Sequence, residues 1–313
     1  MSNSQLTSTP TPQAAPPTEV VNIVKNRNRG KLAPGEKSLV ASPGTWFVWF
    51  GIAAFFIFLF GIVLSVLVDS LGKPWFNTWL PESFTLGWYQ ESWARFDLTH
   101  IIGVTLLVAF SVIVISVIIG VPASYVLARS NFPGKKLVML LFLLPILIPP
   151  ITFGIPLATV MYNFGLGRTV LAVILVNLVP SVPFVIITMT PFIEQINPSI
   201  ENAARMCGAS MYRVFTKILA PLLIPGILAA SILVLVRTVG MFDLTFLVSG
   251  PSSDTLVVAI YRAMTSAGGG ESRQLISSMG VIYTAMMLLI LIIALRFINP
   301  TQLVAQVKDS RED

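Results

Sequence analysis

The chain has 313 residues, of which 55% are hydrophobic and only 11% are charged, and its mean hydropathy is +0.82. Soluble proteins carry about 25% charged residues, so this composition excludes a soluble enzyme and a disordered or disulfide-rich secreted protein. A single cysteine and a single histidine allow no internal disulfide and argue against a histidine-built metal site. The net charge of +6 has three possible explanations: binding to nucleic acid, binding to anionic lipid, or orientation in a membrane. The positions of the charges decide among them.

The first predicted segment, residues 1–44, differs in composition from the rest of the chain. It contains six prolines, many Ser, Thr, Asn and Gln residues, and five basic residues. Because it lacks the apolar content of a core, we expect a disordered basic tail in the cytoplasm, which either sets topology or binds anionic lipid. A signal peptide is not expected, because the first apolar run begins only at Thr45 and exceeds the h-region of about 7–15 residues.

Six apolar runs follow, each close to or above the roughly 20 residues that a helix needs to cross a bilayer. They cover residues 45–68, 101–128, 137–161, 169–190, 218–240 and 275–295. Since an open strand cannot satisfy its backbone in lipid, we predict an all-α polytopic membrane protein with six transmembrane helices. The transmembrane domain is expected to be 45–297, and residues 298–313 are expected to form a second cytoplasmic tail.

The Lys and Arg residues predict the orientation of these helices. With the N-terminus in the cytoplasm, fourteen of them lie on the cytoplasmic side and five on the other side. The positive-inside rule therefore puts both termini in the cytoplasm. The outer segment 69–100 carries five Trp and Tyr residues that form either an interfacial belt or a protein-docking surface: Trp75, Trp79, Trp88, Tyr89 and Trp93.

The loop between the fourth and fifth runs predicts a short helix. Asn197 is a suitable N-cap, Pro198 suits the first helical position, and Gly208 is a natural stop. A helix of about ten residues is too short to be stable alone in water, so it has to pack on something. Ala203 and Ala204 give it a small, smooth surface that suits a groove in another protein, and Ser210 can cap a second helix.

This loop resembles the signature loop of the permease subunits of binding-protein-dependent ABC importers. The signature is Glu-Ala-Ala, three residues, Gly, nine residues, and Ile-x-Leu-Pro. The chain has Asn202-Ala203-Ala204, Gly208-Ala209-Ser210 and Ile218-Leu219-Ala220-Pro221. The resemblance covers about residues 84–297, including Phe-Thr-Leu-Gly-Trp-Tyr at 84–89 and Ala-Arg-Ser-Asn-Phe-Pro-Gly-Lys at 128–135.

The resemblance implies a fold like that of type I ABC importers, in which residues 198–208 are a coupling helix that docks into a cleft of a cytoplasmic ATPase. The residues implied in coupling are Glu201, Asn202, Ala203, Ala204, Arg205, Gly208, Ala209, Ser210 and Pro221. Asn202 replaces the family's Glu and can only donate and accept hydrogen bonds. Either Glu201 substitutes for that Glu or the matching ATPase differs.

The resemblance also implies partners: a second, homologous permease chain, two ATPase subunits and an external solute-binding protein. The chain itself would be a non-catalytic subunit without a cofactor, because ATP and Mg belong to the ATPase subunits, and it contains no Gly-rich phosphate loop. Its expected location is the inner membrane of a bacterium, in contact with lipid, and no nucleic acid is expected as a partner.

Four residues are candidates for a translocation pathway: Asn177, Ser181, Arg237 and Asp243. Prolines recur in the third to fifth runs and bend helices, either to line a cavity or simply to pack. Arg237 is the one charge inside a span; it either faces the cavity, which favours hydroxylated or anionic solutes, or snorkels to the outer surface. Asn177 and Ser181 line a polar path or bond within their own helix. Asp243 lies in a stretch, 242–250, that resembles sugar permeases.

Two other functional classes compete with an importer permease. An ion-coupled secondary transporter generally needs acidic or histidine side chains within its spans, and the six runs contain none. An intramembrane enzyme needs a catalytic constellation, and His100 and Cys207 are better explained as structural. The solute is expected to be small and hydrophilic, polyamine-like, a sugar or a related organic molecule, although Arg237 argues against a cationic polyamine.

Overall fold

The computed structural model describes residues 43–75, 80–266 and 270–296. The two predicted tails lie outside these residues, except for Pro43 and Gly44, and so does Trp79. The described residues are almost entirely helical, as predicted, and their one isolated β-bridge joins Gly72 and Phe84. The chain divides into two compact units, residues 1–62 and 63–313.

The first described helix, α2 (Pro43–Leu71), crosses the boundary between the two units. Its large apolar side chains from Trp46 to Val63 are exposed, and many of them are aromatic. A continuous apolar surface of this kind is not stable in water, whereas lipid solvates it. The apolar, aromatic-rich surface of this helix therefore suits contact with lipid.

The core of the second unit is built on two long helices, α4 (Leu98–Arg129) and α7 (Val170–Glu194). They approach closely at Gly120, where a Cβ atom would lie only 2.6 Å from Cγ1 of Val185. Small residues at such a contact let helix backbones come together, which is a main source of packing energy in membranes. These two helices form the frame on which the remaining spans pack.

The fifth span is longer than its apolar run. It begins at α9 (Met211–Val214), continues through a π-helical turn, η1 (Phe215–Leu219), and becomes α10 (Ala220–Val239). Pro221 lacks the N–H group that would close the α-helical bond at this point, which accounts for a wider turn just before it. α10 packs against α4, α7 and the last span, α13 (Arg273–Arg296).

The third predicted span, 137–161, is bent at its prolines, and the bend is a complete break of the helix. The structure has two helices, α5 (Lys135–Leu147) and α6 (Pro150–Asn163), bent by 93° relative to each other. Pro149 and Pro150 cause the break, because a residue before proline is forced out of the helical region, and Ile148 and Pro149 are extended with ψ of 134° and 131°. The described residues thus hold five helices long and apolar enough to span a membrane, or six if this pair is one span.

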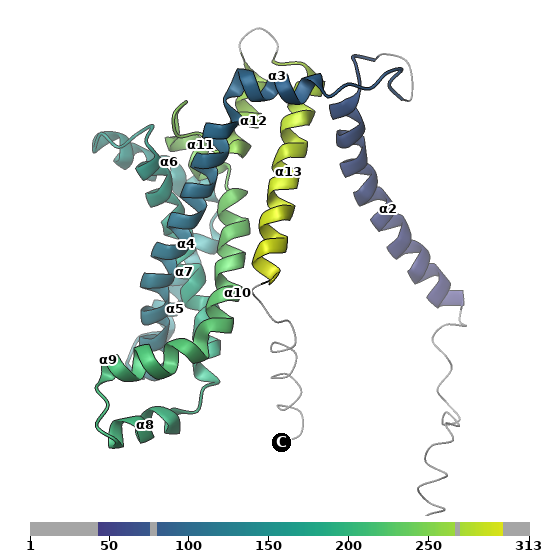
Figure 1. The fold of residues 1–313 in the computed structure, drawn as a ribbon. Helices are drawn as coiled ribbons and strands as arrows, with labels where there is room; N and C mark the ends of the chain where they lie inside the picture. The colour runs from purple at the N-terminus through teal and green to yellow at the C-terminus, as the bar shows by residue number, and fades with distance from the viewer. Residues whose placement is uncertain (1–42, 76–79, 267–269, 297–313) are drawn as a thin grey trace, which may run out of the picture. The chain divides into compact units, whose positions relative to one another are not determined.

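Three short helices lie at the end of the second unit where α4 begins (Figure 1): α3 (Gly87–Phe96), α11 (Asp243–Val248) and α12 (Leu256–Thr265). Asp69, in the end of α2 that belongs to the second unit, accepts a hydrogen bond from Ser277 and pairs with Arg273 at 2.9 Å, which ties this end to α13. Trp88 and Tyr89 use their polar atoms in similar internal hydrogen bonds, to the backbone of Gly72 and to Ser70. These two aromatic residues therefore help to hold this end together.

Candidate functional site

The short predicted helix is present as α8 (Pro198–Met206), at the end of the second unit where α4 finishes (Figure 1). The Asn197 side chain accepts a hydrogen bond of 2.9 Å from the backbone N–H of Ser199, and Pro198 takes the first helical position. Both start signals in the sequence are thus confirmed. The loop before α5 lies at the same end, because Lys135 reaches to 4.0 Å from Glu194, the last residue of α7.

A tight turn ends α8 at Gly208. This residue has a φ of +79°, and its N–H donates to the carbonyl of Arg205 while the N–H of Ala209 donates to the carbonyl of Ala204. This pair of bonds is the Schellman motif, which satisfies the last carbonyls of a helix and favours glycine at the left-handed position. Ser210 then caps α9 by accepting from the N–H of Arg213, as its sequence predicts.

The two faces of α8 differ in character. Asn202, Ala203 and Arg205 are exposed, together with two apolar side chains, Ile200 and Met206, the latter with 89% of its surface accessible. Exposed apolar residues on a short polar helix at the end of a bundle make this face a candidate contact surface. We call these five residues the outer face of α8.

The inner face of α8 packs on the rest of the chain. Ala204 and Ala209 are partly buried against the main hydrophobic core. Glu201 is only 3% exposed, and its carboxylate pairs with Nε of Arg129 at 2.8 Å and accepts a hydrogen bond of 2.7 Å from the hydroxyl of Tyr125. Since Glu201 is bound inside the chain, it does not substitute on the outer face for the Glu that Asn202 replaces.

Sequence reasoning did not identify Tyr125 and Arg129 as partners of α8. Both lie in the last turns of α4, more than 70 residues before Glu201, so their proximity depends on tertiary structure. The one sequence feature that could have drawn attention to Arg129 is Ala128-Arg129-Ser130, which lies within the segment resembling importer permeases. The remaining predicted coupling residue, Pro221, is exposed in the first turn of α10.

The predicted pathway residues on α7 lie inside helix packing. Asn177 is 1% exposed, and its amide donates to the carbonyl of Val173 and, at 3.3 Å, to the hydroxyl of Thr245 on α11. Ser181 is 2% exposed. Asp243 is partly buried in the first turn of α11. The structure therefore brings Asn177 and the α11 helix together, while a role of these residues in a pathway stays a prediction.

Arg237 extends toward the middle of α7. Its guanidinium carbon lies 5.7 Å from the centre of the Phe184 ring, a cation–π contact. Among the described residues, no carboxylate lies within 4.0 Å of Arg237. An arginine without an acidic partner inside a span is a candidate for contact with a polar or anionic solute.

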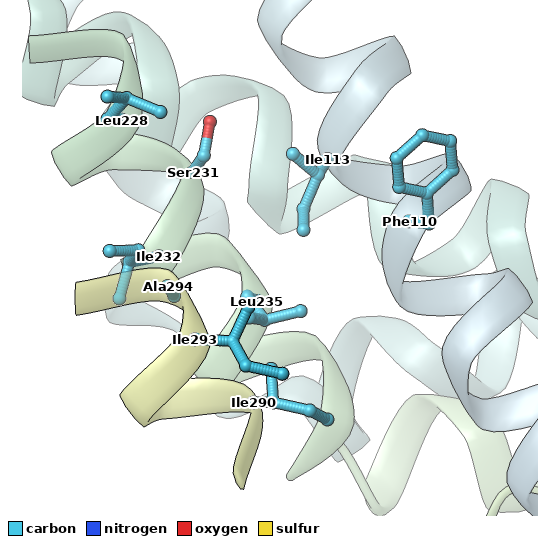
Figure 2. Close-up of a pocket in the computed structure, with 9 residues that line it drawn as sticks. All are labelled: Phe110, Ile113, Leu228, Ser231, Ile232, Leu235, Ile290, Ile293 and Ala294. Carbon is cyan, nitrogen blue, oxygen red and sulfur yellow. The ribbon is translucent and has the colours of Figure 1, made fainter. Parts of the chain in front are cut away.

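An apolar pocket of about 430 Å³ lies between α4, α10 and α13 (Figure 2). It is lined by Phe110, Ile113, Leu228, Ser231, Ile232, Leu235, Ile290, Ile293 and Ala294. Ser231 is the only polar residue in this lining, so the pocket suits an apolar group and not a hydrophilic solute. In the part of the chain that the structure describes, no three His, Cys, Asp or Glu side chains gather where they could hold a metal ion.

Comparison with known proteins gives a family match over more than half of the chain. The family described as "Binding-protein-dependent transport system inner membrane component" matches residues 120–302, a range that includes α8, Tyr125 and Arg129. Among solved structures, a bacterial ABC transporter involved in the import of the acidic polysaccharide alginate has a TM-score of 0.64 over 92% of this chain and 99% of that chain. The identity is 15%, so this similarity is one of fold.

Three curated relatives match parts of the chain. The trehalose permease protein SugB of Mycobacterium tuberculosis is 37% identical over 39% of this chain and 45% of its own length. The sulfate permease protein CysT of Salmonella typhimurium is 28% identical over 51% of this chain and 65% of its own. The molybdenum permease protein ModB of Haemophilus influenzae is 29% identical over 60% of this chain and 90% of its own length. The chain thus spans less than two thirds of the first two relatives.

Proposed function

Because the chain belongs to the family of binding-protein-dependent transport system inner membrane components, we propose that it is the permease subunit of an ATP-driven importer. The observation that carries this proposal is the outer face of α8. Apolar side chains at Ile200 and Met206, a small one at Ala203 and polar ones at Asn202 and Arg205 are presented there on a capped helix, at the end of the second unit that the charge distribution assigns to the cytoplasm. A cleft in a cytoplasmic ATPase is the partner that fits this face.

The assembly that follows has three kinds of component. Two ATPase subunits bind ATP and Mg, two homologous permease chains form the pathway, and an external binding protein delivers the solute. When ATP closes the ATPase pair, α8 moves with it and the membrane helices open the pathway to the outside. The chain would sit in the inner membrane of a bacterium with both termini in the cytoplasm, and it would carry out no chemistry itself. Its family gives no support to an ion-coupled secondary transporter.

We assign the solute to small hydrophilic molecules that are hydroxylated or anionic. Arg237 supports this assignment, because its guanidinium donates hydrogen bonds to hydroxyl and oxyanion groups and repels cations. The relatives' names point the same way, since they refer to trehalose, sulfate and molybdenum. A polyamine, which the sequence left open, is disfavoured by the same positive charge.

Purification with its partners tests the proposed function. The chain is co-expressed with the candidate ATPase, second permease and binding protein, and ATP hydrolysis is measured in proteoliposomes. We expect a stable complex whose hydrolysis is stimulated by binding protein loaded with trehalose, sulfate or molybdate. A chain that carries solute without an ATPase subunit, driven by an ion gradient, would contradict the proposal.

Arg237→Ala is expected to raise the solute concentration needed for half-maximal transport by about tenfold or more, because a hydrogen bond to a charged group contributes about 1.5–3 kcal/mol. Uptake of radiolabelled solute at graded concentrations measures this. Arg237→Lys keeps the charge but loses the paired N–H donors of the guanidinium. Its half-maximal concentration should lie between those of the parent chain and Arg237→Ala. If Arg237→Ala instead improves uptake of a cationic polyamine, the assignment of the solute class is wrong.

A further inference from the structure

Three buried or partly buried side chains join α8 to α4, and we call Tyr125, Arg129 and Glu201 the clamp. Oε1 of Glu201 lies 2.8 Å from Nε of Arg129, and Oε2 accepts a hydrogen bond of 2.7 Å from the Tyr125 hydroxyl. Both carboxylate oxygens of the one buried residue of α8 are therefore held by α4. Charge-assisted bonds of this kind are short and directional.

The clamp also reaches the segments on either side of α8. Arg129 donates a second hydrogen bond, of 2.7 Å, to the carbonyl of Ile196 in the link between α7 and α8. The ring of Tyr125 meets Phe215 of η1 edge to face, with ring centres 5.6 Å apart. Two residues of α4 therefore contact the entry to α8, α8 itself and the start of the fifth span.

Without the clamp, α8 would be attached to the helix bundle only by weaker contacts. Its flanking connections, residues 195–197 and 207–210, are short segments outside the regular helices. The apolar contacts of Ala204 and Ala209 involve only small side chains. Arg205 lies 3.9 Å from Glu201 in the same helix and 3.2 Å from Sδ of Met211 in α9, but it is half exposed, so these contacts contribute little.

We propose that Tyr125 and Arg129 are positioning residues that make α8 and α4 move as one body. α4 packs along most of α7 and also against α10, so a displacement of α8 would pass through the clamp directly into the centre of the helix bundle. A buried ion pair suits this task, because its strength depends on the geometry of both partners. The inference rests on the proposed function in assuming that an ATPase displaces α8.

The single cysteine of the chain makes the attachment of α8 measurable. Cys207 is exposed in the C-cap of α8, so a spin label can be attached to the full-length chain without removing other cysteines. We expect an immobilised label in the parent chain and a clearly more mobile label in Arg129→Gln and in Glu201→Gln. Lys136→Gln removes an exposed charge from the same end of the molecule and should leave the label immobilised.

Transport measurements then separate positioning from simple stability. In the assembled transporter, Arg129→Gln and Glu201→Gln are expected to keep ATP hydrolysis while solute moved per ATP falls about tenfold or more, since each leaves a buried group unpaired. The exchanged pair, Arg129→Glu with Glu201→Arg, should recover part of both the label immobilisation and the coupling. An immobile label in both single variants, or a mobile label with unchanged coupling, overturns the inference.

The outcome for the clamp is distinguishable from that for the proposed function. Label mobility is measured on the chain alone, in lipid nanodiscs, and needs no ATPase. If the parent chain binds no ATPase subunit, the proposed function fails whatever the label reports. If the ATPase binds and the single variants remain fully coupled, only the clamp is wrong.

Discussion

Gly208→Val is expected to abolish transport while leaving the chain inserted in the membrane. Gly208 has a φ of +79°, a conformation that costs an ordinary residue about 1–2 kcal/mol and a β-branched residue more. A Cβ atom at this position would meet no other atom within 4 Å, so the expected defect comes from the backbone and not from crowding. Because a helix of nine residues is not stable alone, loss of the turn should misplace the whole of α8.

Two substitutions at the same position serve as controls. Gly208→Asn should retain most activity, because asparagine tolerates the left-handed conformation. Gly208→Asp has nearly the same shape but adds a negative charge at the C-terminal end of α8, where the helix dipole disfavours it, and we expect a strong loss of transport. Uptake and membrane-fraction blots measure transport and insertion. Normal uptake by the valine variant would show that the geometry of this turn does not matter for function.

The boundaries of α8 could be predicted because the signals for them are local. The Asn197 cap, the proline after it and the glycine at its end each act within a few residues, and the structure has them in those roles. The long spans are predictable for a similar reason, since 20 or so apolar residues in sequence leave few alternatives to a helix in lipid. Local chemistry thus accounts for where most elements begin and end.

The features that the sequence left open or missed depend on distant partners or on adjacent prolines. Pro149 and Pro150 look like one more packing kink in an apolar run, whereas together they hold two residues in extended conformation and break the span. The clamp could not be derived from the loop sequence, because it requires the end of α4 to lie beside α8. Glu201, which stands next to the family's signature residues, is therefore buried inside the chain, contrary to the option that it faces the ATPase.

The burial of Glu201 changes what the outer face of α8 offers a partner. With that carboxylate bound to α4, the face presents an amide at Asn202, a methyl group at Ala203 and a cation at Arg205, flanked by Ile200 and Met206. Such a face favours shape and apolar contact over an ion pair to a basic group. We therefore expect the matching ATPase cleft to be apolar with an acidic or neutral polar rim.

Ala203→Arg is expected to abolish binding of the ATPase while leaving the fold unchanged. Ala203 is exposed, so the new side chain meets no other part of this chain, but a bulky cation in a closed cleft is unpaired and costs several kcal/mol. Co-purification of the ATPase with the tagged chain measures the loss, and it should exceed about tenfold, because each 1.4 kcal/mol changes a dissociation constant tenfold. ATP-dependent uptake should fall with it.

The neighbouring alanine and a nearby loop residue make the test specific. Ala204 is partly buried against the core, so Ala204→Arg should disturb the chain itself and lower its yield and thermal stability even without an ATPase. Asn131→Arg adds the same charge to an exposed position in the loop before α5 and should change neither property. If Ala203→Arg binds the ATPase as well as Asn131→Arg does, the outer face of α8 is not the docking surface.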